Sequence, residues 1–146
     1  MMRAAGLVLA VAVLCVSCAG PTTSDSALLS QAGRSAQSAV SELQTVDLAA
    51  RTQLGDHAWW SYTDVVVTSS EDSMSAIEGT FDSRQPPTVD TDAVYQRTTK
   101  ALSDAADLVT AMRISVRRHD TASLRRQTAQ IAPLVRRLNR LGKLAP

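Results

Sequence analysis

Apolar side chains recur every three or four residues along four successive stretches of this chain of 146 residues. Because an α-helix turns once every 3.6 residues, each stretch places these side chains on one helical face, which must be buried against another element. Hydrophobic residues make up 45% of the chain, which is enough to build such a core. The four stripes consist, in chain order, of Leu28, Ala32, Ala36, Ala39, Leu43, Val46 and Ala50; Trp60, Thr63, Val67, Ser70, Met74, Ile77 and Phe81; Val94, Thr98, Ala101, Ala105, Leu108, Met112 and Val116; and Leu124, Thr128, Ile131, Val135, Leu138 and Leu141.

Short polar joins separate these stretches. Gly55 is typical of a helix end, and Asp56 is a suitable cap for the helix that follows. Residues 82–90 contain two adjacent prolines, which cannot lie inside a helix, and the next helix is expected to be capped by Asp90 or Thr91.

The last join and the last helix have their own markers. His119 and Asp120 form a tight connection in which Asp120 is a good N-cap. Pro133 removes one backbone hydrogen bond inside the fourth stretch and is expected to kink the helix or split it near Ala132. Since short joins make consecutive helices antiparallel, we predict an all-α, four-helix up-down-up-down bundle over residues 26–145, with a Pro-kinked last helix.

The second stretch is also compatible with a strand. Residues 59–68 are rich in aromatic and β-branched side chains, which favour β-structure. Ser69, Ser70 and Gly79 weaken a helix locally. The alternative fold is therefore three helices with an irregular or stranded second segment.

Residues 1–20 have the layout of a bacterial export signal. Arg3 supplies a positive start, an uncharged apolar run covers residues 4–16, and small residues follow. The run is about 13 residues long, whereas about 20 are needed to span the hydrocarbon core of a bilayer. We therefore expect an export signal rather than a permanent transmembrane helix.

The sequence LCVSC at residues 14–18 resembles a bacterial lipoprotein lipobox, in which a small residue precedes the modified cysteine. The family prefers leucine three places before that cysteine, and Cys15 stands there in this chain. The resemblance implies that Cys18 carries a thioether-linked diacylglycerol and becomes the first residue of the mature protein. It thus implies a signal peptide over residues 1–17, a polar tether over residues 18–25, and a lipid anchor at the extracytoplasmic face of the cell membrane, or at the outer membrane of a diderm host. A plain secretory signal with an incidental cysteine is the alternative.

Basic residues are concentrated near the C-terminus. From residue 113 onward there are nine basic residues and one acidic residue, although the formal net charge of the whole chain is only +1. That overall charge gives no argument for nucleic acid as a partner. The cations of the fourth stretch lie opposite its apolar stripe and are candidate contacts for anionic lipid or an anionic envelope polymer. They are Arg125, Arg126, Arg136, Arg137, Arg140 and Lys143.

The same asymmetry has an internal explanation. In an up-down-up-down bundle, the end of the fourth helix lies at the same pole as the end of the second and the start of the third. The acidic residues of those two ends are Glu78, Asp82, Asp90 and Asp92. Pairing with them would neutralise the arginines and specify the order of the helices, although each exposed pair adds only about 0–1 kcal/mol.

The sequence offers little support for catalysis or a bound cofactor. His57 and His119 are the only histidines, and their spacing matches no metal or haem motif. With Asp56 and Asp120 they would form at most a weak metal site, and two exposed loop histidines are the alternative. The chain has no G-x-S-x-G turn and no glycine-rich phosphate loop. We therefore expect no enzyme, with no catalytic residues, metal or cofactor.

Two adjacent tryptophans mark a candidate contact with a partner. Neighbouring residues on a helix point about 100° apart, so Trp59 and Trp60 cannot both face the core. We expect one of them to be exposed at the pole farther from the membrane, where it would contact a partner together with His57. The alternative is that both rest on the bundle.

These features lead to an expected function. We expect a membrane-anchored, non-enzymatic bundle that contacts an envelope protein or other envelope component, with regulation of a membrane enzyme as one form of that role. The alternative is a carrier of a small molecule such as haem, a lipid or a siderophore, which requires a cavity of a few hundred Å³ lined by the stripe residues. The alanine-rich first stripe favours tight packing over such a cavity.

Overall fold

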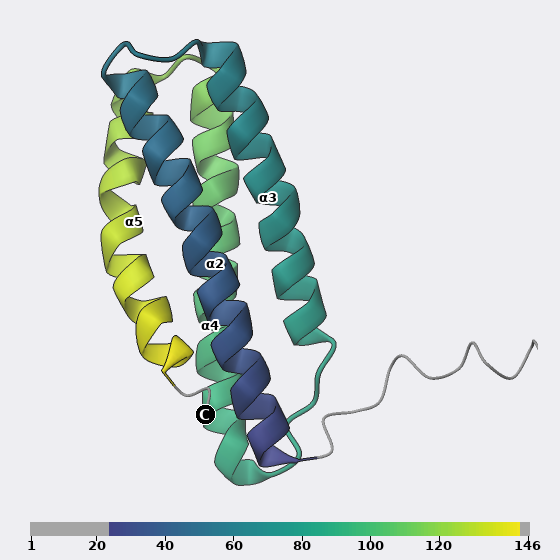
Figure 1. Ribbon diagram of the computed structural model, residues 1–146. Helices are drawn as coiled ribbons and strands as arrows, with labels where there is room; N and C mark the ends of the chain where they lie inside the picture. The colour runs from purple at the N-terminus through teal and green to yellow at the C-terminus, as the bar shows by residue number, and fades with distance from the viewer. Residues whose placement is uncertain (1–23, 144–146) are drawn as a thin grey trace, which may run out of the picture.

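The computed structural model describes residues 24–143, which form a four-helix bundle (Figure 1). The helices are α2 (Asp25–Leu54), α3 (Trp60–Asp82), α4 (Val89–Arg117) and α5 (Thr121–Gly142), and consecutive helices run antiparallel. No strand is present in the described part of the chain. The predicted all-α bundle is confirmed, and the strand considered for residues 59–68 is wrong, because α3 begins at Trp60 and buries Thr63 and Val67 on one helical face.

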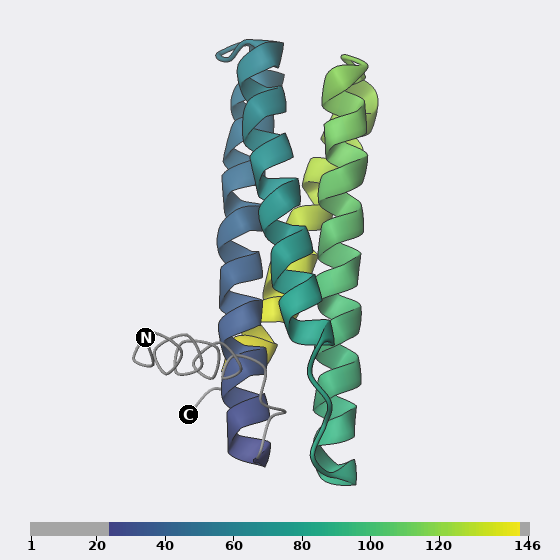
Figure 2. The same ribbon diagram turned by 90° about the vertical axis from the view of Figure 1, so that its right-hand side faces the viewer.

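The connections divide the bundle into two poles (Figure 2). The N-terminal pole contains Ser24, the join at residues 83–88 and the end of α5 at Lys143. The far pole contains the joins at residues 55–59 and 118–120. α2 contacts all three other helices, whereas α3 and α5 lie on opposite sides and share no contact within residues 24–143.

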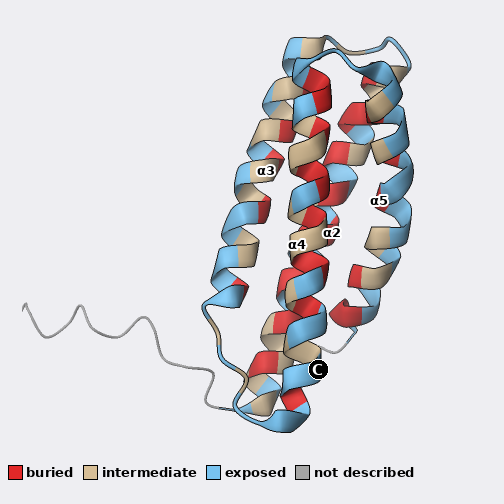
Figure 3. Ribbon diagram, turned by 180° about the vertical axis from the view of Figure 1, so that it is seen from behind, coloured by how far each residue is buried: buried red, intermediate tan, exposed pale blue. Residues whose placement is uncertain are grey.

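The core follows the predicted stripes. Every stripe residue of α2 is fully buried, and the buried positions of all four helices form the inner faces seen in Figure 3. Only Trp60, Ile77, Val94 and Val135 of the stripes are partly exposed, and each packs against the core cluster. The alanines of α2 and α4 permit the direct contact between these two helices, because a small side chain allows two backbones to approach closely.

Gly55 ends α2 as predicted, but the predicted N-caps agree with the structure in only one of three cases. Asp120 is the N-cap of α5, as predicted. Asp56 does not cap α3, because it adopts a left-handed conformation with a φ of 59° and α3 begins only after Trp59. Neither Asp90 nor Thr91 caps α4, whose N-cap is Thr88.

Pro133 lies inside α5 without ending it. The helix runs unbroken from Thr121 to Gly142, so the alternative of a split near Ala132 is wrong. Figure 1 shows α5 changing direction along its length, as expected for a helix with an interior proline. Pro133 and Ala129, whose carbonyl loses its helical donor, are both exposed, so water can satisfy that carbonyl.

The Asp120 cap makes part of the stability dependent on pH. The Ser123 hydroxyl donates to Asp120 Oδ2 at 2.6 Å and the Ser123 amide donates to Oδ1 at 2.9 Å, and these bonds lower the pKa of Asp120. The unfolded chain, with an Asp pKa of about 3.9, therefore binds a proton first as the pH falls. The contribution is complete above about pH 5 and is lost as the pH falls through the lower pKa of the folded state.

We expect Asp120→Asn to reduce this pH dependence, because asparagine still caps the helix but does not titrate. The measurement is the free energy of unfolding in urea at several values between about pH 2 and pH 6. The variant should show a shallower rise of stability with pH than the unaltered chain. Equal slopes would contradict the assignment of this titration to Asp120.

Candidate functional site

The two tryptophans at the far pole differ in exposure, as predicted. Trp59 precedes α3 and is 84% exposed, whereas Trp60 packs against the core cluster. The Trp60 ring stacks on the ring of His119, with 4.7 Å between centroids and 16° between the ring planes. This stack joins the start of α3 to the connection between α4 and α5.

A hollow of about 420 Å³ lies beside this stack. Trp59, Trp60 and His119 line it together with Asp64 and Arg117, which form an ion pair of 3.0 Å between Arg117 Nε and Asp64 Oδ1. The complete lining also includes Ser61 and Val116. The structure therefore brings both tryptophans together with His119 rather than with His57.

His57 is exposed and lies on the connection at residues 55–59, whereas His119 lies on the connection at residues 118–120 of the same pole. Sequence reasoning placed it in the candidate contact because it precedes the tryptophans, but it does not line the hollow. Sequence reasoning missed Tyr62, which is 60% exposed on the first turn of α3. Its spacing of three residues from Trp59 was the available signal, since such residues are neighbours on a helix.

The aspartates next to the two histidines do not form a metal site with them. Asp56 and Asp120 follow the ends of α2 and α4, and the Asp120 carboxylate is occupied by Ser123. Within residues 24–143, no three His, Cys, Asp or Glu side chains lie together in the manner of a metal site.

The basic residues of α5 fall into two groups along the helix. Arg125 and Arg126 lie near the far pole, and Arg136, Arg140 and Lys143 lie toward the N-terminal pole. At 1.5 Å per residue, about 22 Å separate Arg125 from Arg140 along the axis. All five are exposed.

Arg137 differs from these five. It is half-buried and donates to Asp104 of α4, with 2.6 Å between Arg137 Nη1 and Asp104 Oδ2. Asp104 also accepts from Lys100 at 3.1 Å. Partial burial raises the pKa of Asp104, but the hydrogen bonds and charges of Lys100 and Arg137 outweigh it and leave this pKa below its usual value.

The ion pairs predicted between α5 and the acidic residues of α3 and α4 at the N-terminal pole are absent from residues 24–143. α3 and α5 do not pack against each other in the described chain, and no ion pair joins Glu78 or Asp82 to α5. The carboxylates of α3 pair with α4 instead, through Glu71 with Arg113 and through Asp64 with Arg117. Asp90 and Asp92 have no ion pair with α5, and none of the exposed cations of α5 forms an ion pair with a carboxylate within residues 24–143.

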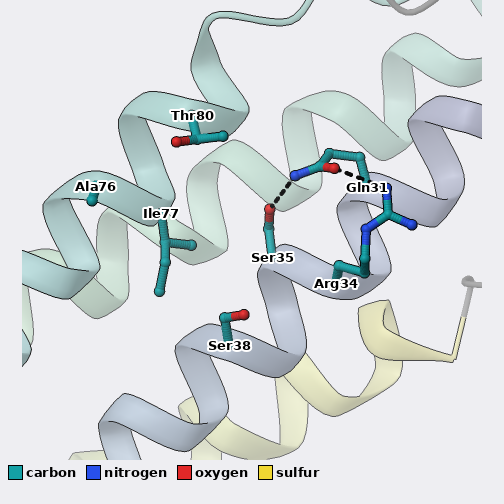
Figure 4. Close-up of a pocket in the computed structure, with 7 residues that line it drawn as sticks. All are labelled: Gln31, Arg34, Ser35, Ser38, Ala76, Ile77 and Thr80. Carbon is teal, nitrogen blue, oxygen red and sulfur yellow. Dashed lines mark hydrogen bonds between the residues drawn. The ribbon is translucent and has the colours of Figure 1, made fainter.

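A further hollow of about 330 Å³ lies between α2 and α3 (Figure 4). Three of its polar side chains bond to each other, since Gln31 donates to Ser35 at 3.3 Å and Arg34 donates to the Gln31 carbonyl at 3.0 Å. Ile77 is its only stripe residue. The carrier alternative requires a cavity lined by the stripes, and this surface hollow does not provide one.

The comparisons with known proteins identify no relative. No protein-family model matches the chain, and neither does any curated protein or solved structure. None of the helices in residues 24–143 combines the length and the apolar character needed to cross a membrane. The predicted signal peptide, Cys18 and most of the predicted tether lie outside the described residues.

Proposed function

We propose that this protein is a bacterial lipoprotein, anchored through diacylglycerol on Cys18, whose helical bundle is a non-enzymatic interaction module of the cell envelope. The observation that carries the proposal is the sequence LCVSC at residues 14–18, directly after an apolar run of export-signal length. The helical bundle that follows it supports the second part of the proposal.

The geometry of the bundle gives the proposed anchor a direction. Seven peptide steps lead from Cys18 to Asp25, and a fully extended chain covers at most about 25 Å over that length. α4 has 29 residues and is therefore about 44 Å long. The tether thus holds the N-terminal pole close to the bilayer, and an upright bundle presents its far pole to the envelope space.

The exposed aromatic side chains are the proposed contact with an envelope protein. Trp59 is 84% exposed and Tyr62 is 60% exposed, and both lie at the far pole. Tryptophan and tyrosine are enriched among the residues that dominate protein interfaces, because each buries a large area with few rotatable bonds. The Trp60–His119 stack gives this surface a rigid base.

The test of the anchor is the intact mass of the protein purified from its own host. The expected chain begins at Cys18 and carries the added mass of a diacylglycerol. Tandem fragmentation should place that mass on Cys18. An unmodified sulfur at Cys18, or a chain released into the medium, would refute the anchor.

The test of the contact surface compares Trp59→Ala with Val89→Ala. Val89 is 90% exposed at the N-terminal pole, so it is a matched control for loss of an exposed apolar side chain. Both variants should keep their stability within about 0.5 kcal/mol, whereas Trp60→Ala should lose about 1–3 kcal/mol through its stack and its contact with the core. After crosslinking in the host, only Trp59→Ala should lose specific partner bands. Identical crosslinking patterns for Trp59→Ala and Val89→Ala would contradict the proposed contact.

A further inference from the structure

Three arginines of α4 and α5 surround one hollow near the N-terminal pole. The hollow has a volume of about 370 Å³ and is lined by Arg97 of α4 and by Arg137, Arg140 and Leu141 of α5. This volume falls within the range of sites for small ligands. Arg97 was not among the residues singled out from the sequence.

Most of the hydrogen-bond donors of these arginines are unused by the described protein. Arg97 uses its Nε to donate to the Ala93 carbonyl at 2.9 Å, and Arg137 uses Nη1 to bind Asp104. Arg140 has no hydrogen bond or ion pair within residues 24–143. Since each guanidinium carries five N–H donors, most of their donors remain available.

The charge around the hollow is strongly positive. Arg97, Arg137, Arg140 and the neighbouring Lys100 contribute four positive charges, and Asp104 is the one carboxylate bonded to any of them. The C-terminal end of α5 adds a partial negative charge of about half a unit, which leaves a clear positive excess. An occupant with two or more acceptor oxygens and negative charge satisfies both the donors and the charge.

We propose that this hollow, the arginine pocket of Arg97, Arg137 and Arg140, binds a phosphate group. Guanidinium groups bind phosphate through parallel N–H···O bonds, and the side chains of three arginines from two helices line the pocket. Two sources supply this chemistry, the headgroup of an anionic lipid and a free phosphate. The lipid source rests on the proposed membrane anchor, because the short tether holds this pole beside the bilayer, whereas binding of free phosphate does not require the anchor.

The experiment uses residues 18–146 with Cys18→Ser, the chain that remains after the proposed cleavage, so that neither acylation at that position nor the apolar run at residues 4–16 contributes to binding. The first arm titrates inorganic phosphate at constant ionic strength and follows binding by calorimetry. The second arm measures sedimentation with vesicles of phosphatidylglycerol, with vesicles of phosphatidylcholine, which is zwitterionic and has no net charge, as the comparison. The test variant is Arg97→Gln/Arg140→Gln, and the matched control is Arg125→Gln/Arg136→Gln, which removes the same charge from exposed positions outside the pocket.

The pocket variant is expected to weaken binding about tenfold or more, because it removes charged donors, and the control is expected to weaken it less than about threefold. This difference with inorganic phosphate supports a site for free phosphate, and with phosphatidylglycerol vesicles it supports a site for a lipid headgroup. Equal effects of the two double variants in both arms would overturn the pocket and leave only a general charge effect. The mass of the native protein tests the anchor separately, so failure of one proposal is distinguishable from failure of the other.

Asp104→Asn is expected to have the opposite effect on phosphate binding from the arginine variants. It removes the carboxylate that holds Arg137 Nη1, so it should tighten binding of the favoured probe several-fold. A role of this network in stability alone would not increase binding. Unchanged or weaker binding by Asp104→Asn would overturn the participation of Arg137.

Discussion

Phe81→Ala is expected to lower the free energy of unfolding by about 3–5 kcal/mol. Phe81 is fully buried in the last turn of α3 and is the largest of the fully buried side chains. Its ring stacks on Tyr95 of α4 with 5.4 Å between centroids. The substitution therefore removes apolar contacts and leaves a cavity that the surrounding helices can fill only in part.

The position of Phe81 increases the effect. α3 contacts only α2 and α4 in the described chain, so it has fewer neighbours than α2. The Tyr95 hydroxyl also donates to the Asp82 carbonyl at 3.2 Å, so the same pair of helix ends is joined by a ring stack and a hydrogen bond. A domain of this size has a total stability of about 5–15 kcal/mol, so the loss is a large part of it.

Urea unfolding of the Cys18→Ser chain with and without Phe81→Ala measures the change. Tyr62→Ala is the matched control, because it removes an aromatic side chain that is 60% exposed on the same helix, and it should change stability by less than about 0.5 kcal/mol. A similar, small loss for both variants would show that Phe81 does not fill the core as the structure indicates.

The sequence predicted the helices and their buried faces because both depend on the spacing of apolar residues. Val67 and Leu102 are buried in different helices, and only Val67 belongs to a predicted stripe. Leu102 follows Ala101 on a broader buried face, which the contact of α4 with three helices requires. A single stripe of residues therefore underestimates the core of a helix that has several neighbours.

The helix ends were harder to predict because they depend on the conformation of the joins. Asp56 has the composition of a cap but adopts a left-handed conformation, which places it outside α3. The hydroxyl of Thr88 donates to Asp25 Oδ1 at 2.9 Å, across a separation of 63 residues in the chain. A local pattern does not reveal such a contact, because it forms only after α2 and α4 have packed.

The arginine pocket shows the same limit. Arg137 and Arg140 were candidates from the sequence because they lie opposite the stripe of α5. Arg97 was not, since it is 40 residues from Arg137 and reaches the pocket only through the packing of α4 against α5. The sequence predicts that a helix face is basic, but the neighbouring helix decides which cations converge.

Cys18→Ser is expected to abolish incorporation of a labelled fatty acid into this protein, whereas Cys15→Ser is expected to leave it unchanged. The proposed bond is a thioether, and the serine hydroxyl cannot form it. Cys15 is the matched control, because it is the only other cysteine and lies three residues earlier, after the bulky Leu14. The measurement is the label recovered with the protein after its host has grown on an alkyne-tagged palmitate.

The incorporated fatty-acid label is a better measure of acylation than membrane fractionation is. The apolar run at residues 4–16 would hold a chain that retains its signal at the membrane, so fractionation does not distinguish acylation from retention. A single myristoyl chain binds a bilayer with a constant of only about 10⁴ M⁻¹, whereas a second chain makes binding stable, since each buried CH₂ adds about 0.8 kcal/mol. The two chains of the proposed diacylglycerol would therefore be sufficient for stable anchoring. Label that persists in Cys18→Ser and disappears in Cys15→Ser would assign the anchor to the other cysteine, and label absent from the unaltered chain would refute the anchor itself.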